Sequence, residues 1–424
     1  MRMKWVLWLI LLGGLGRGAL AFLEEPDTPL LLKTADEMIK TATRLRGLEP
    51  KGEISKGVKS REEISQYLNE KVQEDYSTGE LEQEGRMFRR LGLLPAAIDY
   101  KDFTLKLLTE QVGGFYDPDK KSFFIASWLS AEEQKPVMVH ELTHALQDQN
   151  FDVGRILRED RKQHNDDRTL AHEAVLEGDG MVVMLNFLLE PAHRGFADLP
   201  DLASVMHLQM STMQSQFAVF KDAPVYLQET LLFPYGYGSS FIQQVWKRNP
   251  SWQSVNRIYS DMPASTEQIM HPDKYLSARD DPKPVPEQDP AARLGKGWQV
   301  AYRNVLGEFS MGLLLGLHMS EERARRCATG WGGDEALLLE NGEGRDAVFV
   351  NSVWDTDEDA GKFFTAMQDW LQQAYPKARK TSGESPDRLT LVSNGELHSV
   401  VREGSSVRFV IGLPEAEGAA SKLP

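Results

Sequence analysis

The stretch that most constrains this chain is "VMVHELTHALQDQ", residues 137–149. It holds two histidines four positions apart, His140 and His144, with Glu141 beside the first. Good helix formers follow Pro136 without a break, so the stretch is predicted to be helical. Its other early positions are uncharged, which favours a buried helix over a solvated one. Two histidines on an ordinary helix face are the alternative interpretation.

The spacing of these residues suits a metal ion. Residues i and i+4 lie on one face of a helix, so His140 and His144 would direct both imidazoles to one point. A tetrahedral zinc ion is bound in this way. Glu141 lies one step round the helix, beside the open position, where it can act as a general base on an activated water. The sequence therefore predicts a Zn²⁺ site that can catalyse hydrolysis.

A catalytic zinc ion needs a third protein ligand, and the best candidates lie downstream in "AHEAVLEGDG". Glu173 and Glu177 are four residues apart, so both face one side of a predicted helix. Either could complete a His-His-Glu set. A charged solvent face is the competing interpretation for each, but Glu177 stands among apolar residues, where a buried acid needs a partner such as a cation.

The first residues have the form of a secretory signal peptide. "MRMK" is basic, a short apolar run follows, and "ALA" at 19–21 is a cleavage site, so residues 1–21 are expected to be removed on export to a periplasm or the medium. A membrane anchor is the alternative, but the run of about twelve residues is shorter than the roughly 20 that span a bilayer. No other stretch is apolar enough, so no stable membrane insertion is expected afterwards.

Charge and cysteine content exclude some partners and some forms of stabilisation. Removing residues 1–21 takes the formal charge from -15 to -18, because they carry Arg2, Lys4 and Arg17 and no acid. So acidic a chain repels phosphate backbones, and nucleic acid is not an expected partner. Cys327 is the single cysteine, so no disulfide can close within the chain.

The pattern along the chain predicts an α+β protein that is predominantly helical. Hydrophobic periodicity predicts helices through 22–110, a β-hairpin over 113–127 and a helix over 166–190 capped by Asp166 or Asp167. Pro and Gly content predicts a loop at "FPYGYG" and a turn at "GWGGD". We expect a main domain over 22–345, a small α+β unit over 346–412 and a disordered tail over 413–424.

Several of these motifs carry a family resemblance. "HELTHALQDQ", "LEGDG" and "STEQIMHPDKY" resemble those of uncharacterised secreted bacterial and archaeal proteins classed as zinc metallopeptidases of the gluzincin type. The similarity continues through "GLLP", "GFYDPDKK", "YGYG" and "GWGGD". It implies a zincin-like core in which a glutamate on the next helix is the third ligand. Glu177 is then the first choice and Glu173 the second, with Asp179 a candidate to orient a zinc histidine.

The resemblance also implies a reaction. A peptide or protein substrate would pair with the edge of the hairpin, and Glu141 would serve as general base. An oxyanion donor besides zinc is expected, with His271, Tyr237 and Tyr116 as candidates in that order. Two alternatives remain open: an inert zinc-containing binding protein, and a zinc amidase that acts on a cell-wall amide.

Overall fold

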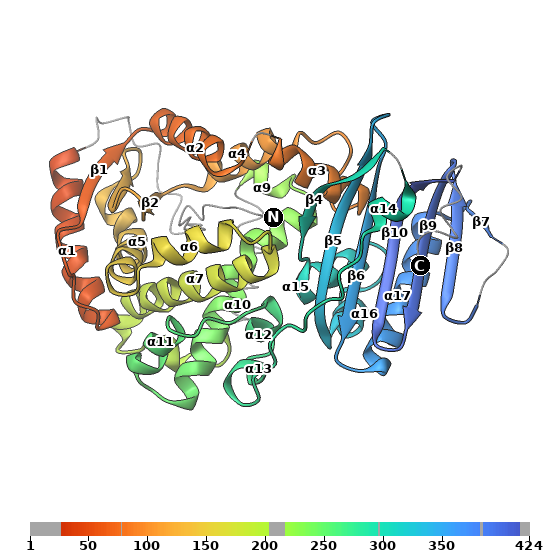
Figure 1. Cartoon of the computed structure of the whole chain (residues 1–424). Coiled ribbons are helices and arrows are strands. Elements are labelled where there is room, and N and C mark those ends of the chain that lie inside the picture. Colours follow the sequence, from red (N-terminus) through yellow and green to blue (C-terminus); the bar gives the residue numbers. More distant parts are fainter. Residues whose placement is uncertain (1–26, 78, 203–216, 296, 382–384, 416–424) are drawn as a thin grey trace.

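The computed structural model describes residues 27–77, 79–202, 217–295, 297–381 and 385–415. The predicted signal peptide lies outside these ranges, as does most of the predicted tail. A helical body occupies one side of the molecule and a large sheet the other (Figure 1). The protein is therefore α+β and mostly helical, as the sequence predicts. None of the described helices is long and apolar enough to cross a bilayer.

The N-terminal part consists of four helices and one strand: α1 (Thr28–Arg46), β1 (Ser55–Lys59), α2 (Arg61–Asp75), α3 (Glu80–Arg90) and α4 (Tyr100–Gln111). A capping box begins α2, because the Ser60 side chain accepts from the Glu63 backbone N–H and the Glu63 side chain accepts from the Ser60 backbone N–H. The strand was not predicted. It is a short, half-exposed segment that gains its partners only in the folded protein.

The predicted hairpin is present as β2 (Gly114–Asp117) and β3 (Ser122–Ala126), which pair antiparallel. β1 adds parallel to β3, so the small sheet has the order β1-β3-β2 and β2 lies at its edge. Phe115 and Phe123 are fully buried on opposite faces of this sheet, each in a different core cluster. The hairpin thus lies on the core and leads directly into the helix that carries the two histidines.

That helix is α5 (Ala131–Phe151), and it begins at a second capping box formed by Ser130 and Glu133. Pro136 lies inside it, in its second turn. α6 (Val153–Arg161) follows, and then α7 (Asp166–Leu189), whose N-cap is Asn165 and not the predicted Asp166 or Asp167. Asn165 accepts from the Arg168 backbone N–H, so the residue one position earlier caps the helix.

The prediction of a loop at "FPYGYG" is wrong, because these residues lie within the long helix α10 (Val225–Arg248). Pro234 is inside this helix, and Gly238 fits a close contact with α7 that is described below. Tertiary packing therefore outweighs the local preference of Pro and Gly for loops. Shorter elements complete the region: α9 (Ala218–Lys221), α11 (Trp252–Ile258), α12 (Thr266–Met270), α13 (Asp273–Leu276) and α14 (Pro290–Leu294).

The C-terminal part contains a seven-stranded sheet of order β4-β5-β6-β10-β9-β8-β7. The pairs given by the register are antiparallel throughout. Its elements are β4 (Trp298–Asn304), α15 (Gly307–Gly316), α16 (Glu321–Ala328), β5 (Trp331–Asn341), β6 (Asp346–Trp354), α17 (Asp357–Ala374), β7 (Arg379–Lys380), β8 (Arg388–Ser393), β9 (Glu396–Glu403) and β10 (Ser406–Pro414).

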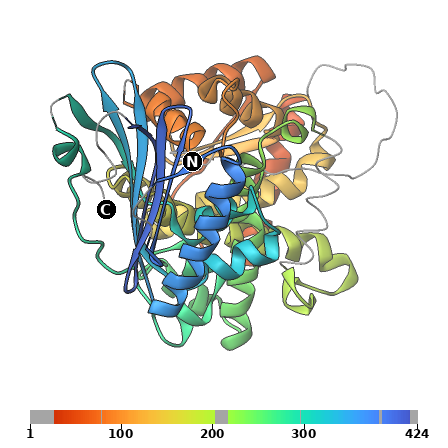
Figure 2. The same cartoon turned by 90° about the vertical axis from the view of Figure 1, so that its right-hand side faces the viewer.

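The two faces of this sheet pack against different partners. Leu338 and Val350 point into the core shared with α17 and the helical body. Leu337 and Leu339 point the other way, into a smaller cluster with α14. Figure 2 shows the sheet nearly edge-on with α17 against one face. Alternate residues of the strands therefore serve two separate cores, as the twofold repeat of a strand requires.

Two features of this sheet differ from the sequence-based description. "GWGGD" is not simply a turn: only Gly330 precedes the strand, and Trp331 begins β5 with a bulge near Gly333. Asp334 accepts from the indole N–H of Trp331 and from the backbone N–H groups of Leu306 and Gly307. The sheet also includes β4 and β5, which precede residue 346, and β10 extends to Pro414.

Candidate metal centre

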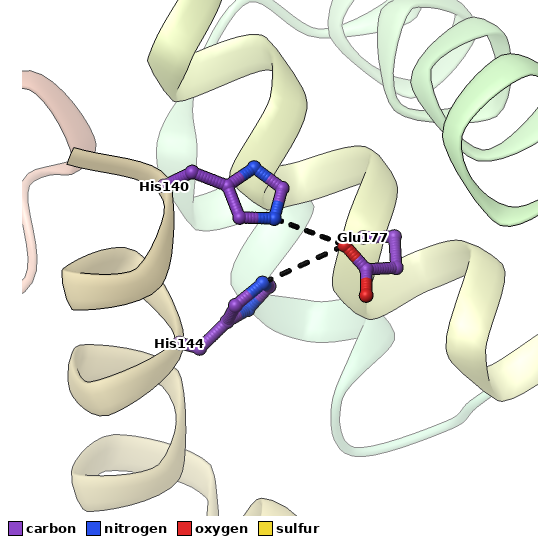
Figure 3. A group of neighbouring side chains, drawn as sticks. All are labelled: His140, His144 and Glu177. Atoms are coloured by element: carbon purple, nitrogen blue, oxygen red, sulfur yellow. Dashed lines mark hydrogen bonds and ion pairs between the residues drawn. The ribbon is translucent and has the colours of Figure 1, made fainter. Parts of the chain in front are cut away.

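Helices α5 and α7 bring three potential ligands together (Figure 3). His140 Nε2 lies 3.0 Å from Glu177 Oε2, and His144 Nε2 lies 3.6 Å from the same oxygen. One donor atom from each residue falls within 4.8 Å of the other two. All three side chains are fully buried. Positions i and i+4 of one helix thus face a glutamate of the next, as the sequence predicts.

The spacing of the donor atoms fits a tetrahedral ion. Two ligands that are each about 2.0 to 2.1 Å from a zinc ion lie about 3.3 Å apart, and the two distances to Glu177 bracket that value. Two imidazoles and one carboxylate are also the donor set of catalytic zinc sites, which keep a fourth position open. The residues present therefore fit a divalent metal ion, and the group could bind one.

The electrostatics of the site lead to the same conclusion. Burial lowers the pKa of His140 to about 3 and that of His144 well below its usual value, with His140 adding to the second shift. Burial also raises the pKa of Glu177 well above its usual range, and the nearby Glu173 adds to this. Without a metal ion, the protein thus favours neutral forms of both imidazoles and of the Glu177 carboxyl group. A bound cation would reverse this preference by stabilising the carboxylate.

A glycine allows α7 to approach the two histidines. A Cβ atom on Gly180 would lie 2.9 Å from His140 Cε1 and 3.0 Å from His144 Cε1. The first distance is shorter than real Cβ contacts and the second is tighter than most of them, so any other residue would require the imidazoles to shift. Gly180 therefore sets the separation of the helices at the site, and "LEGDG" supplies both a ligand and the space beside it.

A hydrogen-bonded relay holds the ring of His144. His144 Nδ1 donates to Gln147 Oε1 at 2.7 Å, which leaves Nε2 to face Glu177. Gln147 Nε2 in turn donates to Asp179 Oδ2 at 3.1 Å and to the Leu176 carbonyl at 3.1 Å. The sequence suggested Asp179 as the residue that orients a histidine. It acts through Gln147, which the sequence analysis missed although position i+3 lies on the same helix face.

Asp179 is itself held by residues distant in sequence. Arg46 Nε donates to Asp179 Oδ1 at 2.7 Å, and the Tyr259 hydroxyl donates to Oδ2 at 2.6 Å. The side chains of Arg46 and Asp179 are both fully buried. Arg46 ends α1, so the relay connects the first helix of the protein to the metal centre. No local sequence signal indicates this pairing.

Glu141 lies beside the group on α5, and its carboxylate is held at one oxygen. The Tyr116 backbone N–H of edge strand β2 donates to Glu141 Oε2 at 3.0 Å. Glu141 Oε1 is buried and has no hydrogen-bond partner among the residues that the structure describes. Burial raises the pKa of Glu141 well above its usual range, and the charge of Glu177 adds to the effect. The carboxylate therefore has one oxygen fixed and one available.

The second-choice ligand, Glu173, is not part of the three-residue group in the described chain. It is buried one turn before Glu177, where burial and the charges of Asp160 and Asp166 raise its pKa well above its usual range. A tyrosine that the sequence analysis missed is closer to the ligands. The Tyr235 side chain of α10 hydrogen-bonds Glu177, and its ring centroid lies 6.4 Å from that of His140.

The three candidate oxyanion donors make contacts elsewhere. His271 Nε2 lies 2.8 Å from Glu308 Oε1. Tyr237 stacks on Phe233, with ring centroids 4.9 Å apart. The Tyr116 hydroxyl donates to Asp148 Oδ2 at 2.8 Å, so only the backbone of this residue reaches Glu141. Their catalytic role stays a prediction.

A second group of acids surrounds a lysine. Glu267, Asp280 and Asp355 have carboxylate oxygens within 4.8 Å of one another. Lys274 Nζ donates to all three, at 2.6, 2.8 and 2.7 Å. This group is an ion-pair network that joins α12 and α13 to the end of β6, and the lysine occupies the position that a cation would take.

Comparisons with known proteins add little to this geometry. A family model described as "Domain of unknown function (DUF8575)" matches residues 296–421, which are the seven-stranded sheet and its helices. No curated protein matches the chain. One crystal structure, described as "a putative hydrolase with a novel fold from Chloroflexus aurantiacus", is similar at 15% identity. The match covers 60% of this chain and 91% of that chain, with a TM-score of 0.36.

Proposed function

We propose that the protein is a zinc-dependent peptidase that acts after export. The observation that carries the proposal is the convergence of His140, His144 and Glu177 beside the buried carboxylate of Glu141. A structural zinc site uses four protein ligands, whereas this group supplies three and has an acid next to the open position. A carboxylate beside the open position can activate a water, which favours an enzyme over a binding protein.

The residues of the chain divide the work of hydrolysis. A bound zinc ion would polarise the scissile carbonyl and lower the pKa of the attacking water. Glu141 Oε1 would accept the proton of that water and pass it to the leaving amine. The Tyr116 N–H would keep the other oxygen of Glu141 in place during both transfers. The relay through Gln147 would keep His144 Nε2 unprotonated and directed at the ion.

The substrate class is part of the proposal and follows from the hairpin. β2 is an edge strand whose Tyr116 amide reaches the catalytic carboxylate, so an extended chain beside β2 would pass next to Glu141. Strand addition of this kind recognises the backbone of a peptide and few of its side chains. A cell-wall amide is the alternative, and it would not need the strand edge.

The test is a comparison of the mature wild-type protein with Glu141→Gln. We expect about one zinc ion per chain in both proteins. Casein cleavage by the wild type should be stopped by a chelator, and the rate of cleavage should fall by at least about 10²-fold in the variant. Failure of the wild-type protein to take up zinc would rule out the proposed zinc site. If the zinc-loaded protein cleaves a cell-wall amide but no peptide, the function is that of an amidase and not of a peptidase.

The oxyanion donor is tested in the same assay. His271→Gln, Tyr237→Phe and Tyr235→Phe are measured in parallel for zinc content and for kcat. Substitution of the residue that binds the oxyanion should lower kcat by about 10²- to 10³-fold without loss of zinc. Because Tyr235 hydrogen-bonds Glu177, we expect its variant to lose zinc more readily than the other two.

A further inference from the structure

A cavity of about 360 Å³ lies between α10, α15 and α16. Apolar side chains make up most of its lining, among them Met270, Phe309 and Leu313. Two further lining residues, Val225 and Leu317, are 62% and 38% exposed and belong to the few large apolar side chains that the described surface leaves in water. The volume is at the lower end of the roughly 300 to 1,000 Å³ of ligand pockets, so a small group would fill it.

The cavity lies away from the candidate metal centre. Tyr237 lines it, whereas Tyr235, two residues earlier on the same helix, hydrogen-bonds the metal-site residue Glu177. Two residues correspond to about 200° of helix rotation, so the two tyrosines leave α10 on opposite sides. A ligand in the cavity would therefore be separated from the metal centre by the body of α10.

One buried acid gives the cavity its chemistry. Glu308 of α15 lines it and is 1% exposed. Glu308 Oε1 is 2.8 Å from His271 Nε2 and accepts from the Thr329 hydroxyl at 3.3 Å. Glu308 Oε2 is buried without a hydrogen-bond partner among the described residues. A buried carboxylate oxygen of this kind needs a donor, and a cationic donor suits it best.

The surroundings of Glu308 are also negative. Glu229 and Glu321 line the same cavity. The cation on its wall, Arg325, is engaged, because its Nη2 lies 2.5 Å from Glu321 Oε1. Behind Glu308, burial raises the pKa of Asp167 to about 7, and the charges of Asp334 and Glu308 contribute. The interior thus favours a positive charge at Glu308.

We propose that this cavity binds an ammonium group carried on a short aliphatic chain, with the ammonium at Glu308 and the chain along Phe309, Leu313 and Leu317. Such a ligand satisfies the open carboxylate oxygen and covers the exposed apolar rim in one step. A free alkyl amine and a lysine side chain of a polypeptide share this chemistry.

Calorimetric titration with n-hexylammonium tests the proposal, with n-hexanol as the uncharged counterpart. We expect saturable binding of one n-hexylammonium per chain and weaker binding of n-hexanol. Glu308→Gln should weaken the binding of n-hexylammonium by about ten- to hundredfold, which corresponds to the loss of one charge-assisted hydrogen bond. The affinity for n-hexanol should be unchanged. Glu322→Gln is the matched control, because this exposed acid on α16 does not line the cavity. Binding that is absent, or equal in the wild type and Glu308→Gln, would overturn the proposal.

A second variant keeps the test decisive if Glu308→Gln fails to fold. Gly312 lines the cavity, and a Cβ atom there would meet only Ala328 Cβ, at an ordinary 3.8 Å. Gly312→Leu should therefore fold, since Leu favours a helix more than Gly does, and fill the space. We expect it to lose n-hexylammonium binding, and retained affinity would contradict the proposal.

Two further experiments identify the source of the ligand and test whether its binding depends on the metal site. Tighter binding of Nα-acetyl-lysine amide than of n-hexylammonium would support the proposal with a polypeptide as the source, and the reverse order would support it with a free amine. The titration is repeated on His144→Ala, which should lose the metal and keep the cavity. Unchanged affinity there shows that the cavity functions whether or not the zinc proposal holds, and lost affinity would overturn the separation of the two sites.

Discussion

Gly178 of α7 and Gly238 of α10 lie backbone against backbone. A Cβ atom on Gly178 would overlap the carbonyl of Gly238, and one on Gly238 would overlap the carbonyl of Ala174. The contact lies one residue after Glu177 and three after Tyr235, so it sets how closely α10 approaches the metal centre. Gly178 of "LEGDG" and Gly238 of "YGYG" are therefore two halves of one contact.

Substitution at this contact should unfold the protein more readily. We expect Gly238→Ala to lower the free energy of unfolding by about 3 kcal/mol or more, because backbone cannot move aside as a side chain can. Urea unfolding followed by circular dichroism measures the change. Gly52→Ala is the control, since no atom lies within 4 Å of a Cβ at that position and its stability should be unchanged. Equal stability of the two variants would contradict the packing described here.

The identity of the third ligand can be tested by metal content alone. Glu177→Gln should abolish zinc binding, because Glu177 Oε2 lies 3.0 Å and 3.6 Å from the two imidazoles. Glu173→Gln should retain about one ion per chain, since Glu173 is outside the group. Metal analysis of the purified variants gives the answer. Loss of the ion from Glu173→Gln alone would assign the ligand to Glu173.

The relay behind His144 should control how tightly the metal is held. Gln147→Leu removes the acceptor for His144 Nδ1 and the donor to Asp179, so we expect zinc affinity to fall by about 10- to 100-fold. Competition with a fluorescent chelator measures the affinity. Gln149→Ala is the control on the same helix, where the side chain binds only the loop at Lys51 and Gly52. Unchanged affinity in Gln147→Leu would show that the ring needs no support.

Asp167 should make stability depend on pH. Burial first, and then the charges of Asp334 and Glu308, raise its pKa to about 7, against the hydrogen bonds from Thr266 that lower it. The folded chain then keeps a proton that the unfolded chain releases near pH 3.8. Stability from this group is therefore full at low pH and is lost as the pH rises to about 7, at up to about 1.4 kcal/mol per pH unit.

Asp167→Asn removes this titration and should flatten the profile. Urea unfolding of both proteins from about pH 5 to about pH 8 gives the difference in free energy, which should decline toward pH 7 and then level off. The exposed Asp222→Asn is the control and should run parallel to the wild type. A wild-type profile parallel to that of Asp167→Asn would show that the carboxyl group ionises normally in the fold.

The metal group was predictable because its signals are local. His140, Glu141 and His144 are fixed by the geometry of one helix, and Glu177 is an acid inside an apolar helix, where only a few roles are open to it. The hairpin and the α+β class followed from hydrophobic periodicity for the same reason. These features depend on residues close together in sequence.

What could not be predicted depends on distant contacts. "FPYGYG" has the composition of a loop, and only the contact with Gly178 explains why it is helical. Strand β1 exists because β3 lies parallel to it, and β5 begins within "GWGGD" because Asp334 accepts three N–H groups there. Tyr235 was missed because it approaches Glu177 only when "FPYGYG" is helical, and the sequence predicted a loop there.

The buried pair of Arg46 and Asp179 has a consequence for the first described helix, α1. Here the first described helix ends in the arginine that neutralises Asp179, and loss of one member of a buried ion pair costs about 3 to 5 kcal/mol. Cleavage beyond residue 46 would leave a bare charge two residues from Glu177. We therefore expect removal of α1 to destabilise the part of the scaffold that holds the three candidate ligands.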